Sequence, residues 1–398
     1  METILWEWTT LGIRWLHVIA GIAWIGSSFY FIHLDLSLRQ QPESPAGSGG
    51  EAWQVHGGGF YHMVKYLIAP SRMPDKLTWF KWEAYTTWLS GMALLIVVYY
   101  AAAPLYLIDR TVLDLTPGAA IGVSIGGLAA GWVVYDLLCR SPLGRADGTL
   151  AAVGFTLLVT FAFGFSLVFS GRGAFMQMGA LIGTMMVGNV FLVIIPNQRK
   201  VVADLLAGRS PDPALGRAAK QRSLHNNYLT LPVVFVMIGT HTPLAFASRW
   251  SWLMLAIILV VGAVIRHFFN QRHKGLPSPW WTWAVAAAGM GAIVWLSLQS
   301  VAIATATGSD TKADVAAVAD IIESRCSMCH AVEPVWEGVD APPKGVILET
   351  ANQIHRQARA IGLQAVFTRA MPPGNVTELT EAERQILAAW ITAGAPSK

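Results

Sequence analysis

Eight long apolar runs constrain the fold of this chain more than any other feature of its sequence. A helix of roughly 20 apolar residues spans the ~30 Å hydrocarbon core of a bilayer. Because backbone polar groups in lipid must be satisfied within the segment, we expect each run to form a membrane-spanning helix. The first 302 residues therefore predict an all-α, eight-helix transmembrane domain. The runs cover residues 10–33, 85–107, 118–139, 149–170, 174–195, 228–247, 251–269 and 279–302.

Lys and Arg are distributed unevenly between the loops that join these runs. The loops after the first, third, fifth and seventh runs are rich in both, whereas the opposite short loops hold only Arg110, Arg172 and Arg249. Basic loops stay on the cytoplasmic side of a membrane. We therefore expect a multi-pass membrane protein with both termini on the side opposite the cytoplasm. The small net charge of +4 gives no reason to expect a nucleic-acid partner.

The chain after the last run has the composition of a soluble domain. Residues 303–312, rich in Ala, Thr, Gly and Ser, predict a linker, and residues 313–398 predict a small helical domain. This domain contains a Cys-Ser-Met-Cys-His motif, which is the attachment pattern of a c-type haem. The thiols of Cys326 and Cys329 would bond the haem vinyl groups, and His330 would bind the iron. We therefore expect one covalent haem c in an all-α, class I-like cytochrome c fold.

The second axial ligand of that iron is predicted to be Met371, which begins a stiff Met-Pro-Pro-Gly segment. Methionine and histidine ligands together raise the haem potential and suit electron transfer. A helix should follow, with Thr380 as its N-cap and Glu383 completing a capping box. Redox dithiols and zinc sites share the Cys-x-x-Cys spacing, but a zinc site needs further ligands, and His355 is the spare histidine nearby.

Four histidines point to a second polar centre in the membrane domain. His17 and His33 are 16 residues apart, and His225 and His241 are separated by the same interval. That spacing corresponds to about 24 Å of helix. Because the two helices run in opposite directions, we expect His17 with His241 at the outer depth and His33 with His225 at the inner depth. Two levels would suit two haem b groups, or one haem b and one polar substrate site. Alternatively, these side chains bond to backbone carbonyls or face lipid headgroups.

The segment from His56 to Glu83 is long and rich in Gly, aromatic and basic residues. It could form a lid or an entrance to a pocket, or lie along the membrane surface as an amphipathic segment. His267 and His273 belong to a basic stretch that ends the seventh run, and we expect both at the cytoplasmic surface.

Several membrane segments resemble the bacterial membrane-bound urate hydroxylases, which join an eight-helix domain to a C-terminal cytochrome c. The resemblance covers nearly the whole chain and implies oxidation of urate to 5-hydroxyisourate in purine catabolism. Electrons would leave one at a time through the haem c to a respiratory acceptor such as a terminal oxidase. The resembling segments are Leu16-His17 to Trp24-Ile25-Gly26, Phe80-Lys81-Trp82-Glu83-Ala84-Tyr85, Ile195-Pro196-Asn197-Gln198-Arg199 and His225-Asn226-Asn227-Tyr228-Leu229-Thr230-Leu231-Pro232.

On this resemblance, urate would bind in the membrane domain, from the cytoplasmic side. A planar anion is held best by fixed hydrogen-bond donors. His33 or His225 would then act as the general base. The candidate substrate-binding residues are Gln198, Arg199, Asn226 and Asn227.

Three other functions fit parts of the sequence. A respiratory subunit would oxidise quinol through haem b and pass the electrons to haem c. A membrane-anchored cytochrome would dock other redox proteins without catalysis, which leaves the polar residues at inner depth unexplained. The first-run segment is also similar to haem-binding helices of copper-resistance and protoporphyrinogen-oxidising membrane proteins, which keeps a protoporphyrinogen oxidase open.

Overall fold

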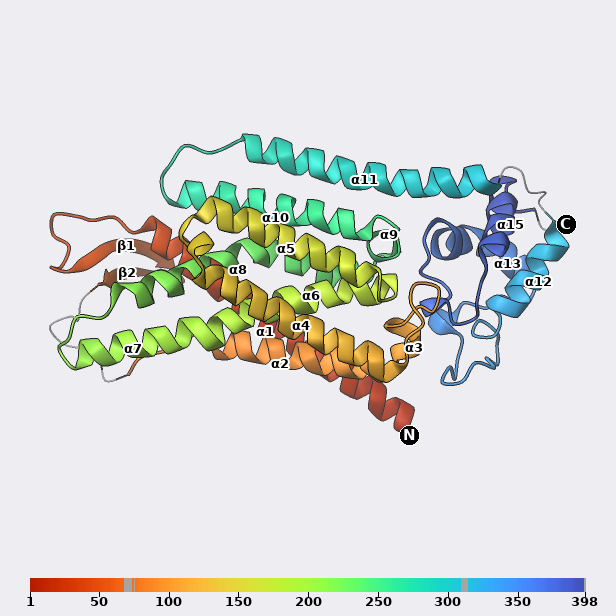
Figure 1. The fold of residues 1–398 in the computed structure, drawn as a ribbon, viewed down its shortest axis with the longest axis horizontal. Coiled ribbons are helices and arrows are strands. Elements are labelled where there is room, and N and C mark those ends of the chain that lie inside the picture. Colours follow the sequence, from red (N-terminus) through yellow and green to blue (C-terminus); the bar gives the residue numbers. More distant parts are fainter. Residues whose placement is uncertain (68–73, 75, 309–313, 397–398) are drawn as a thin grey trace.

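The computed structural model describes residues 1–67, 74, 76–308 and 314–396. Helices occupy all eight predicted apolar runs (Figure 1). The long helices are α1 (Glu2–Ser37), α2 (Trp82–Leu94), α4 (Pro117–Arg140), α5 (Asp147–Ser166), α6 (Gly171–Gly188), α7 (Ile195–Leu206), α8 (Pro213–Gly239), α10 (Ser251–His273) and α11 (Trp281–Gly308). Short helical segments between them are η1 (Leu95–Tyr100), α3 (Ala103–Tyr106), η2 (Pro142–Arg145), η3 (Asn189–Ile194) and α9 (Pro243–Phe246).

Six helical segments in the described part of the chain are long and apolar enough to cross a membrane. They are α1, α4, α5, the continuous α6–η3–α7 segment, α10 and α11. The run at 85–107 differs because α2 is only 13 residues long, widens into the π-helical η1, and breaks before Pro104. α8 has 27 residues, but its first half carries Arg217, Lys220 and Arg222. Eight crossings therefore remain a prediction.

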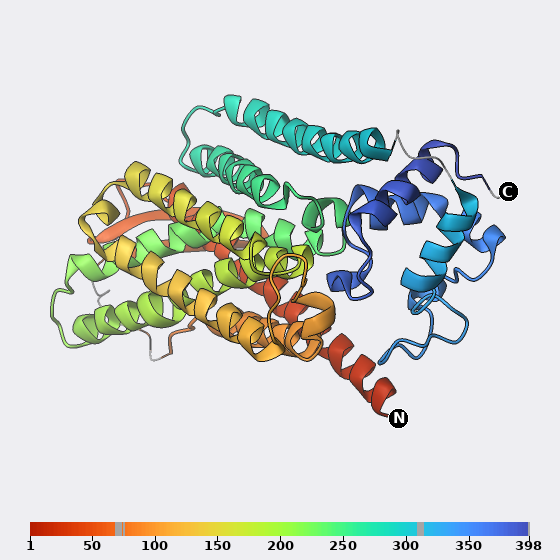
Figure 2. The ribbon, with the colours of Figure 1, turned by 45° about the vertical axis from the view of Figure 1, so that its right-hand side comes forward.

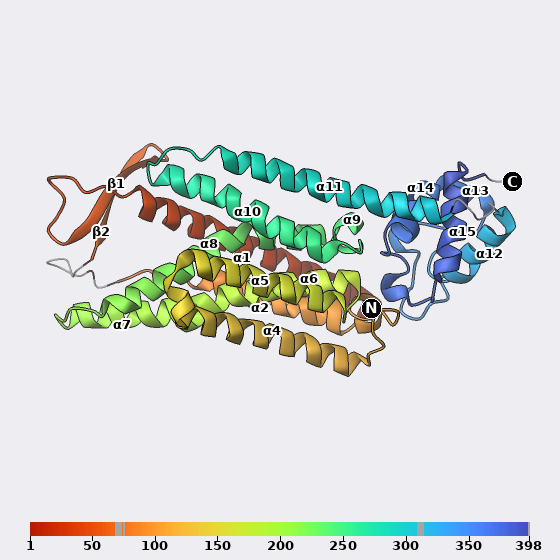
Figure 3. The ribbon, with the colours of Figure 1, turned by 45° about the horizontal axis from the view of Figure 1, so that its top comes forward.

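The long helices lie side by side along the longest axis of the molecule (Figures 1 and 3). The start of α1 and the chain that follows α11 lie at one end, which we call the C-terminal end. α7 and a β-hairpin lie at the other, which we call the hairpin end. α10 and α11 form a pair on one side of the bundle (Figure 2). The described residues nearest the two ends of the chain therefore lie at the same end of the bundle (Figure 1).

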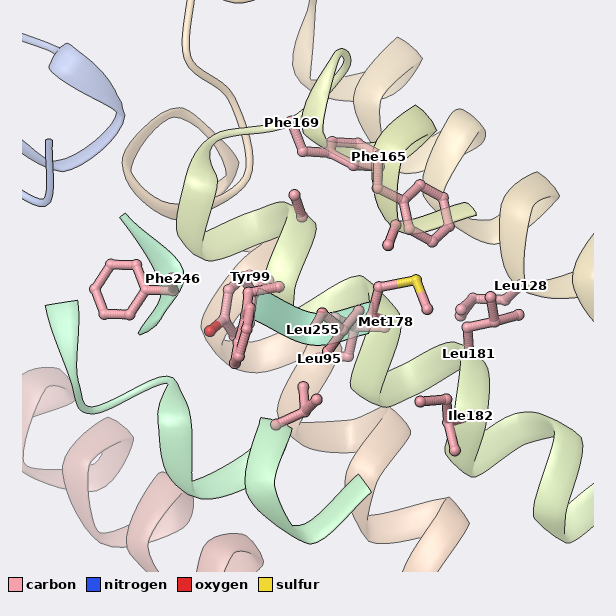
Figure 4. Close-up of a cluster of buried hydrophobic side chains, with 14 of the residues drawn as sticks. Leu95, Tyr99, Leu128, Phe165, Phe169, Met178, Leu181, Ile182, Phe246 and Leu255 are labelled. Atoms are coloured by element: carbon pink, nitrogen blue, oxygen red, sulfur yellow. The ribbon is translucent and has the colours of Figure 1, made fainter. Parts of the chain in front are cut away.

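The core of the bundle is a buried apolar cluster (Figure 4). Leu95 of η1, Leu128 of α4, Phe165 of α5, Met178 of α6 and Leu255 of α10 all contribute to it. Small residues let these helices approach closely, as in other membrane bundles. At Gly262 of α10, for example, an added Cβ would lie 2.5 Å from the ring of Pro232 on α8.

An antiparallel β-hairpin is the main departure from the all-α prediction. β1 (Ser48–His56) pairs with β2 (Gly59–Tyr66). Gly57 and Gly58 form the two-residue turn with positive φ angles of 58° and 80°. Such angles fit a type I′ turn, which glycine adopts without strain and which favours hairpins. The predicted lid or amphipathic segment at 56–83 thus begins as a strand pair, and part of it (68–73 and 75) lies outside the described residues.

The C-terminal segment (residues 314–396) is helical and has its own apolar core, built around Ile322, Leu387 and Trp390. The predicted capping box of Thr380 and Glu383 is confirmed at the start of its last long helix. Where the sequence predicted a linker from residue 303, α11 continues to Gly308, and the remaining linker residues 309–312 lie outside the described residues. The helical elements are α12 (Val315–Arg325), η4 (Pro343–Gly345), α13 (Ala351–Arg356), α14 (Ala358–Ile361), η5 (Gly362–Phe367), η6 (Pro373–Asn375) and α15 (Glu381–Thr392).

Candidate functional site

A buried polar cluster at the hairpin end is centred on Asn189, where η3 meets α4 and α8. The Asn189 amide donates to Tyr135 Oη at 2.9 Å and to Asn226 Oδ1 at 2.8 Å. Its carbonyl oxygen accepts a hydrogen bond from Arg222 at 3.1 Å. The Tyr135 hydroxyl in turn lies 2.8 Å from His225 Nδ1. We call these five residues the Asn189 cluster; it fixes the ring of His225 through one nitrogen.

The Asn189 cluster is complete in both hydrogen bonds and charge. Arg222 is 3% exposed and forms an ion pair with Asp136 at 2.7 Å. Asn226 Nδ2 donates to the carbonyl of Met186 at 2.9 Å. A buried charge that is paired and hydrogen-bonded is the arrangement expected of a structural network. The cluster therefore joins three helical segments without an open donor for a ligand.

A hollow of about 1100 Å³ lies beside His225, between α4, α5, α8, α10 and α11. Most of its lining is apolar, and its charged residues are mainly basic: Arg145, Arg217, Lys220 and Lys274 line it, with Asp147 as the one acid among the described lining residues. A basic concave surface concentrates anions. The hollow is thus suited to attract an anion to the hairpin end.

A second buried cluster lies between α1, α8 and α10, and we call it the Arg266 cluster. Its members are Phe29, His33, Asn227, Arg266, Asn270 and His273. The Arg266 guanidinium lies over the ring of Phe29, 3.9 Å from its centroid. It donates to Asn227 Oδ1 at 3.4 Å and to Asn270 Oδ1 at 3.2 Å.

Two imidazoles complete the Arg266 cluster. The rings of His33 and His273 meet edge to face, with centroids 4.4 Å apart. Nδ1 of His273 is buried and has no hydrogen-bond partner among the described residues, and the same holds for the amide nitrogen of Asn227. His273 was expected at the surface, but the end of α10 turns its ring toward α1. The cluster thus holds one unpaired amide donor and a pair of imidazoles in contact.

The structure separates residues that the sequence placed together. His33 and Asn227 belong to the Arg266 cluster, whereas His225 and Asn226 belong to the Asn189 cluster. Adjacent positions on α8 point about 100° apart, because a helix has 3.6 residues per turn. Gln198 and Arg199 lie exposed on α7, and no hydrogen bond among the described residues joins them to Asn226 or Asn227.

The proposed haem b pair, His17 and His241, also occupies two different environments. His17 Nδ1 donates to the Thr87 carbonyl at 2.9 Å, and its ring packs against Gly91 of α2. His241 is exposed in the turn between α8 and α9. His17 alone therefore has the fixed tautomer that a metal-binding histidine uses.

In the C-terminal segment, the Cys-Ser-Met-Cys-His motif begins where α12 ends. The backbone N–H of His330 donates to the Cys326 carbonyl at 2.9 Å, so the motif forms a tight turn. His330 Nδ1 donates to the Val346 carbonyl at 3.0 Å, which leaves Nε2 as an unprotonated acceptor. A metal-binding histidine is commonly oriented through its other ring nitrogen in this way. The donor set therefore fits a c-type haem.

The two thiols do not have the character of a redox dithiol. Burial raises the pKa of Cys326 to about 12, and burial also raises the pKa of Cys329. Reactive cysteines instead have a lowered pKa, because the thiolate is the attacking form. Both shifts are therefore opposite in direction to those of a reactive dithiol.

Met371 packs against the apolar core of the C-terminal segment, as a haem ligand should. The backbone around it is held by Arg384, which is buried and donates to the carbonyls of Met371 and Ala365. Burial, together with the charge of Arg369, lowers the pKa of Arg384 to about 10. Arg384 thus orients the segment that carries the predicted iron ligand.

The turn that follows Met371 rests directly on the helical bundle. A Cβ added at Gly374 of η6 would lie 2.5 Å from the carbonyl oxygen of Ile108 and 2.7 Å from that of Pro104. The backbone N–H of Arg369 donates to the Ala247 carbonyl at 3.2 Å. The predicted haem-binding segment is therefore seated on the C-terminal end of the membrane helices.

Sequence reasoning did not identify Tyr135, Arg222, Arg266 and Asn270 as members of these clusters. Each lies near the end of a predicted apolar run or in the basic stretch beside it, where polar residues ordinarily face water or headgroups. Arg266 and Asn270 are four residues apart and so share one face of α10. That spacing is the one sequence signal that could have indicated an inward-facing pair.

Comparison with known proteins gives one match. The family model described as urate oxidase, N-terminal, matches residues 3–297. The matched range runs from α1 into α11 and ends before the C-terminal segment. No curated protein and no solved structure matches the chain.

Proposed function

The chain belongs to the urate oxidase N-terminal family, and from this premise we propose that it oxidises urate to 5-hydroxyisourate in a bacterial inner membrane. The main support for the proposal is the range of residues that the family model matches. It covers the apolar helices, which bury two polar clusters at the hairpin end, and the haem motif follows in the same chain. Substrate oxidation and electron exit are thus assigned to different ends of one molecule.

The proposed topology has eight crossings, with the hairpin end in the cytoplasm and both termini in the periplasm. The basic hollow beside His225 lies at the hairpin end, in keeping with the enrichment of Lys and Arg in cytoplasmic loops. The C-terminal segment lies at the other end (Figure 1). Haem c attachment takes place outside the cytoplasm, so this orientation agrees with the motif.

The proposed reaction starts from the urate monoanion, which loses two electrons and gains water at C5 with net release of one proton. A base within the hairpin end accepts a proton during this change. His225 offers Nε2 as an acceptor when its Nδ1–H donates to Tyr135 Oη, and His33 offers a ring nitrogen beside His273. The exposed Gln198 and Arg199 are left out of the proposed substrate site, because they lie apart from both clusters.

Cys326, Cys329, His330 and Met371 would hold one haem c, which would accept electrons singly and pass them to a respiratory acceptor such as a terminal oxidase. The free Nε2 of His330 and the seating of the Met371 segment on the bundle support this assignment. His17, which is held through Nδ1, would offer its Nε2 to a haem b in the membrane domain, whereas His241 is exposed in the turn after α8.

An anaerobic optical titration tests the proposed function. The purified, oxidised full-length protein is mixed with urate while the c-type α-band is recorded and 5-hydroxyisourate is assayed. We expect the band to appear with urate and 5-hydroxyisourate to form. A His330→Gly variant, which lacks the iron ligand, should lose urate-dependent reduction of an external acceptor. Reduction by a quinol but not by urate would contradict the proposal and favour a respiratory quinol-oxidising subunit.

A further inference from the structure

Arg266 carries a buried positive charge that no acidic side chain balances. It is 5% exposed, and among the described residues no carboxylate lies within 4.0 Å of it. The other buried arginine of the hairpin end, Arg222, has Asp136 at 2.7 Å. The acid on the adjoining stretch of α1, Asp35, already forms ion pairs with Lys65 and Lys220.

The contacts that Arg266 does make orient its charge without cancelling it. They are the face of Phe29 and the side-chain oxygens of Asn227 and Asn270, all of which are neutral. Removing a charge from water is costly unless an opposite charge compensates it. Charged residues at such positions in membrane helices usually mark a binding or transport site. A buried guanidinium held only by neutral groups therefore points to an anionic ligand.

The neighbouring groups suit a planar anion with several hydrogen-bonding edges. Asn227 is 0% exposed, and its amide nitrogen is a buried donor without a partner. His33 follows Phe29 by four residues and His273 follows Asn270 by three, so each lies about one helical turn further along its helix, and their rings are in contact. An arginine and an amide can bind the oxygens of such a ligand, and an imidazole can exchange a proton with one of its ring nitrogens.

We propose that Arg266, with Asn227, binds the negative charge of urate in the Arg266 cluster. This inference rests on the proposed function and locates its substrate between α1, α8 and α10. The Asn189 cluster, by contrast, is complete in hydrogen bonds and charge and serves to hold the helices together. His33 is then the histidine placed to take a proton from the bound urate, with His273 beside it.

Equilibrium binding tests the assignment without turnover. Urate is titrated into the full-length holoprotein with its haem pre-reduced, so that no oxidation takes place. Arg266→Gln should weaken urate binding roughly tenfold or more, since a charge-assisted contact is lost. It should also reduce the preference for urate over hypoxanthine, an uncharged purine. Arg209→Gln, at an exposed position of the hairpin end where the side chain pairs with Asp204, is the control and should change the dissociation constant by less than about twofold.

A second pair of variants separates ligand binding from folding. Asn227→Asp places the missing negative charge beside Arg266, so it should raise the Tm of the substrate-free protein and weaken urate binding roughly tenfold or more. Asn226→Asp makes the same change one residue away, where it removes a donor to the Met186 carbonyl, and it should lower the Tm.

Two outcomes would overturn the assignment. One is a wild-type urate affinity in Arg266→Gln while the wild-type protein still oxidises urate; the proposed function would then stand without this site. The other is a lower Tm in substrate-free Asn227→Asp, which would show that Arg266 needs no negative partner. A wild-type protein that neither binds nor oxidises urate would reject the proposed function itself, and the site with it.

Discussion

At the scale of single residues, the two buried arginines of the hairpin end show what a sequence leaves open. The sequence predicted His33 and Asn227 as substrate-site residues, and the structure brings them into one cluster. It did not predict Arg266 or His273, because basic residues that end an apolar run ordinarily reach the headgroups. Which of them turns inward is decided by packing against α1, and the sequence of α10 alone does not contain that information.

Glu383 gives the C-terminal segment a pH dependence that can be measured. Burial alone would raise the pKa of Glu383, but hydrogen bonds from Thr380 and the ion pair with Arg325 outweigh it, so the pKa is lowered. A lowered folded-state pKa adds stability that is present above the unfolded value of about 4.3 and is lost as the pH falls through the folded value.

Glu383→Gln keeps the capping geometry and removes the charge. We expect it to lower the free energy of unfolding of the C-terminal segment by about 1 kcal/mol at neutral pH. Below the pKa that Glu383 has in the folded protein, the substitution should leave this free energy unchanged. Thermal unfolding followed at several pH values measures this difference. Glu337→Gln, at an exposed position, is the control. A loss of stability that stays the same at every pH would show that the charge is not responsible.

At the scale of elements, the apolar runs predicted where helices form but not how they end. α2 stops after 13 residues, because the chain widens into η1 and turns at Ala102 before Pro104. α11 continues into the predicted linker as far as Gly308, and it lies against α15. The sequence analysis did not predict the hairpin, although a Gly-Gly pair between two strand-like segments is a known hairpin signal.

Asp35 ties the hairpin to two helices. It lies on α1 and pairs with Lys65 of β2 and with Lys220 of α8, the latter at 3.4 Å. Asp35→Asn should therefore loosen the hairpin and increase its cleavage by trypsin severalfold in inside-out membrane vesicles. Glu51→Gln, which removes the contact of Glu51 with His62 inside the hairpin, is the control and should change cleavage less. Faster cleavage in right-side-out vesicles instead would contradict the proposed topology.

At the scale of the whole molecule, the C-terminal segment and the helical bundle are in contact through backbone atoms. Gly374 has a φ of 55° and abuts two carbonyl oxygens of the membrane helices. Gly374→Ala should separate these surfaces and raise hydrogen exchange in residues 104–108 and 369–375. Gly345→Ala, at a φ of 68° with nothing within 4 Å, carries the same backbone strain without the collision. Equal exchange in both variants would show that the contact does not hold the parts together.

This seating has a consequence for kinetics. A cytochrome on a free tether has to search for its donor, so its reduction slows in viscous solvent and responds to salt. In this protein no such search is needed, because the turn after Met371 already contacts the bundle in the folded chain. On the proposed function, the transfer of each electron out of the membrane is a first-order event. Its rate depends on the distance and the medium between fixed groups. It does not depend on macromolecular crowding or on the concentration of the protein.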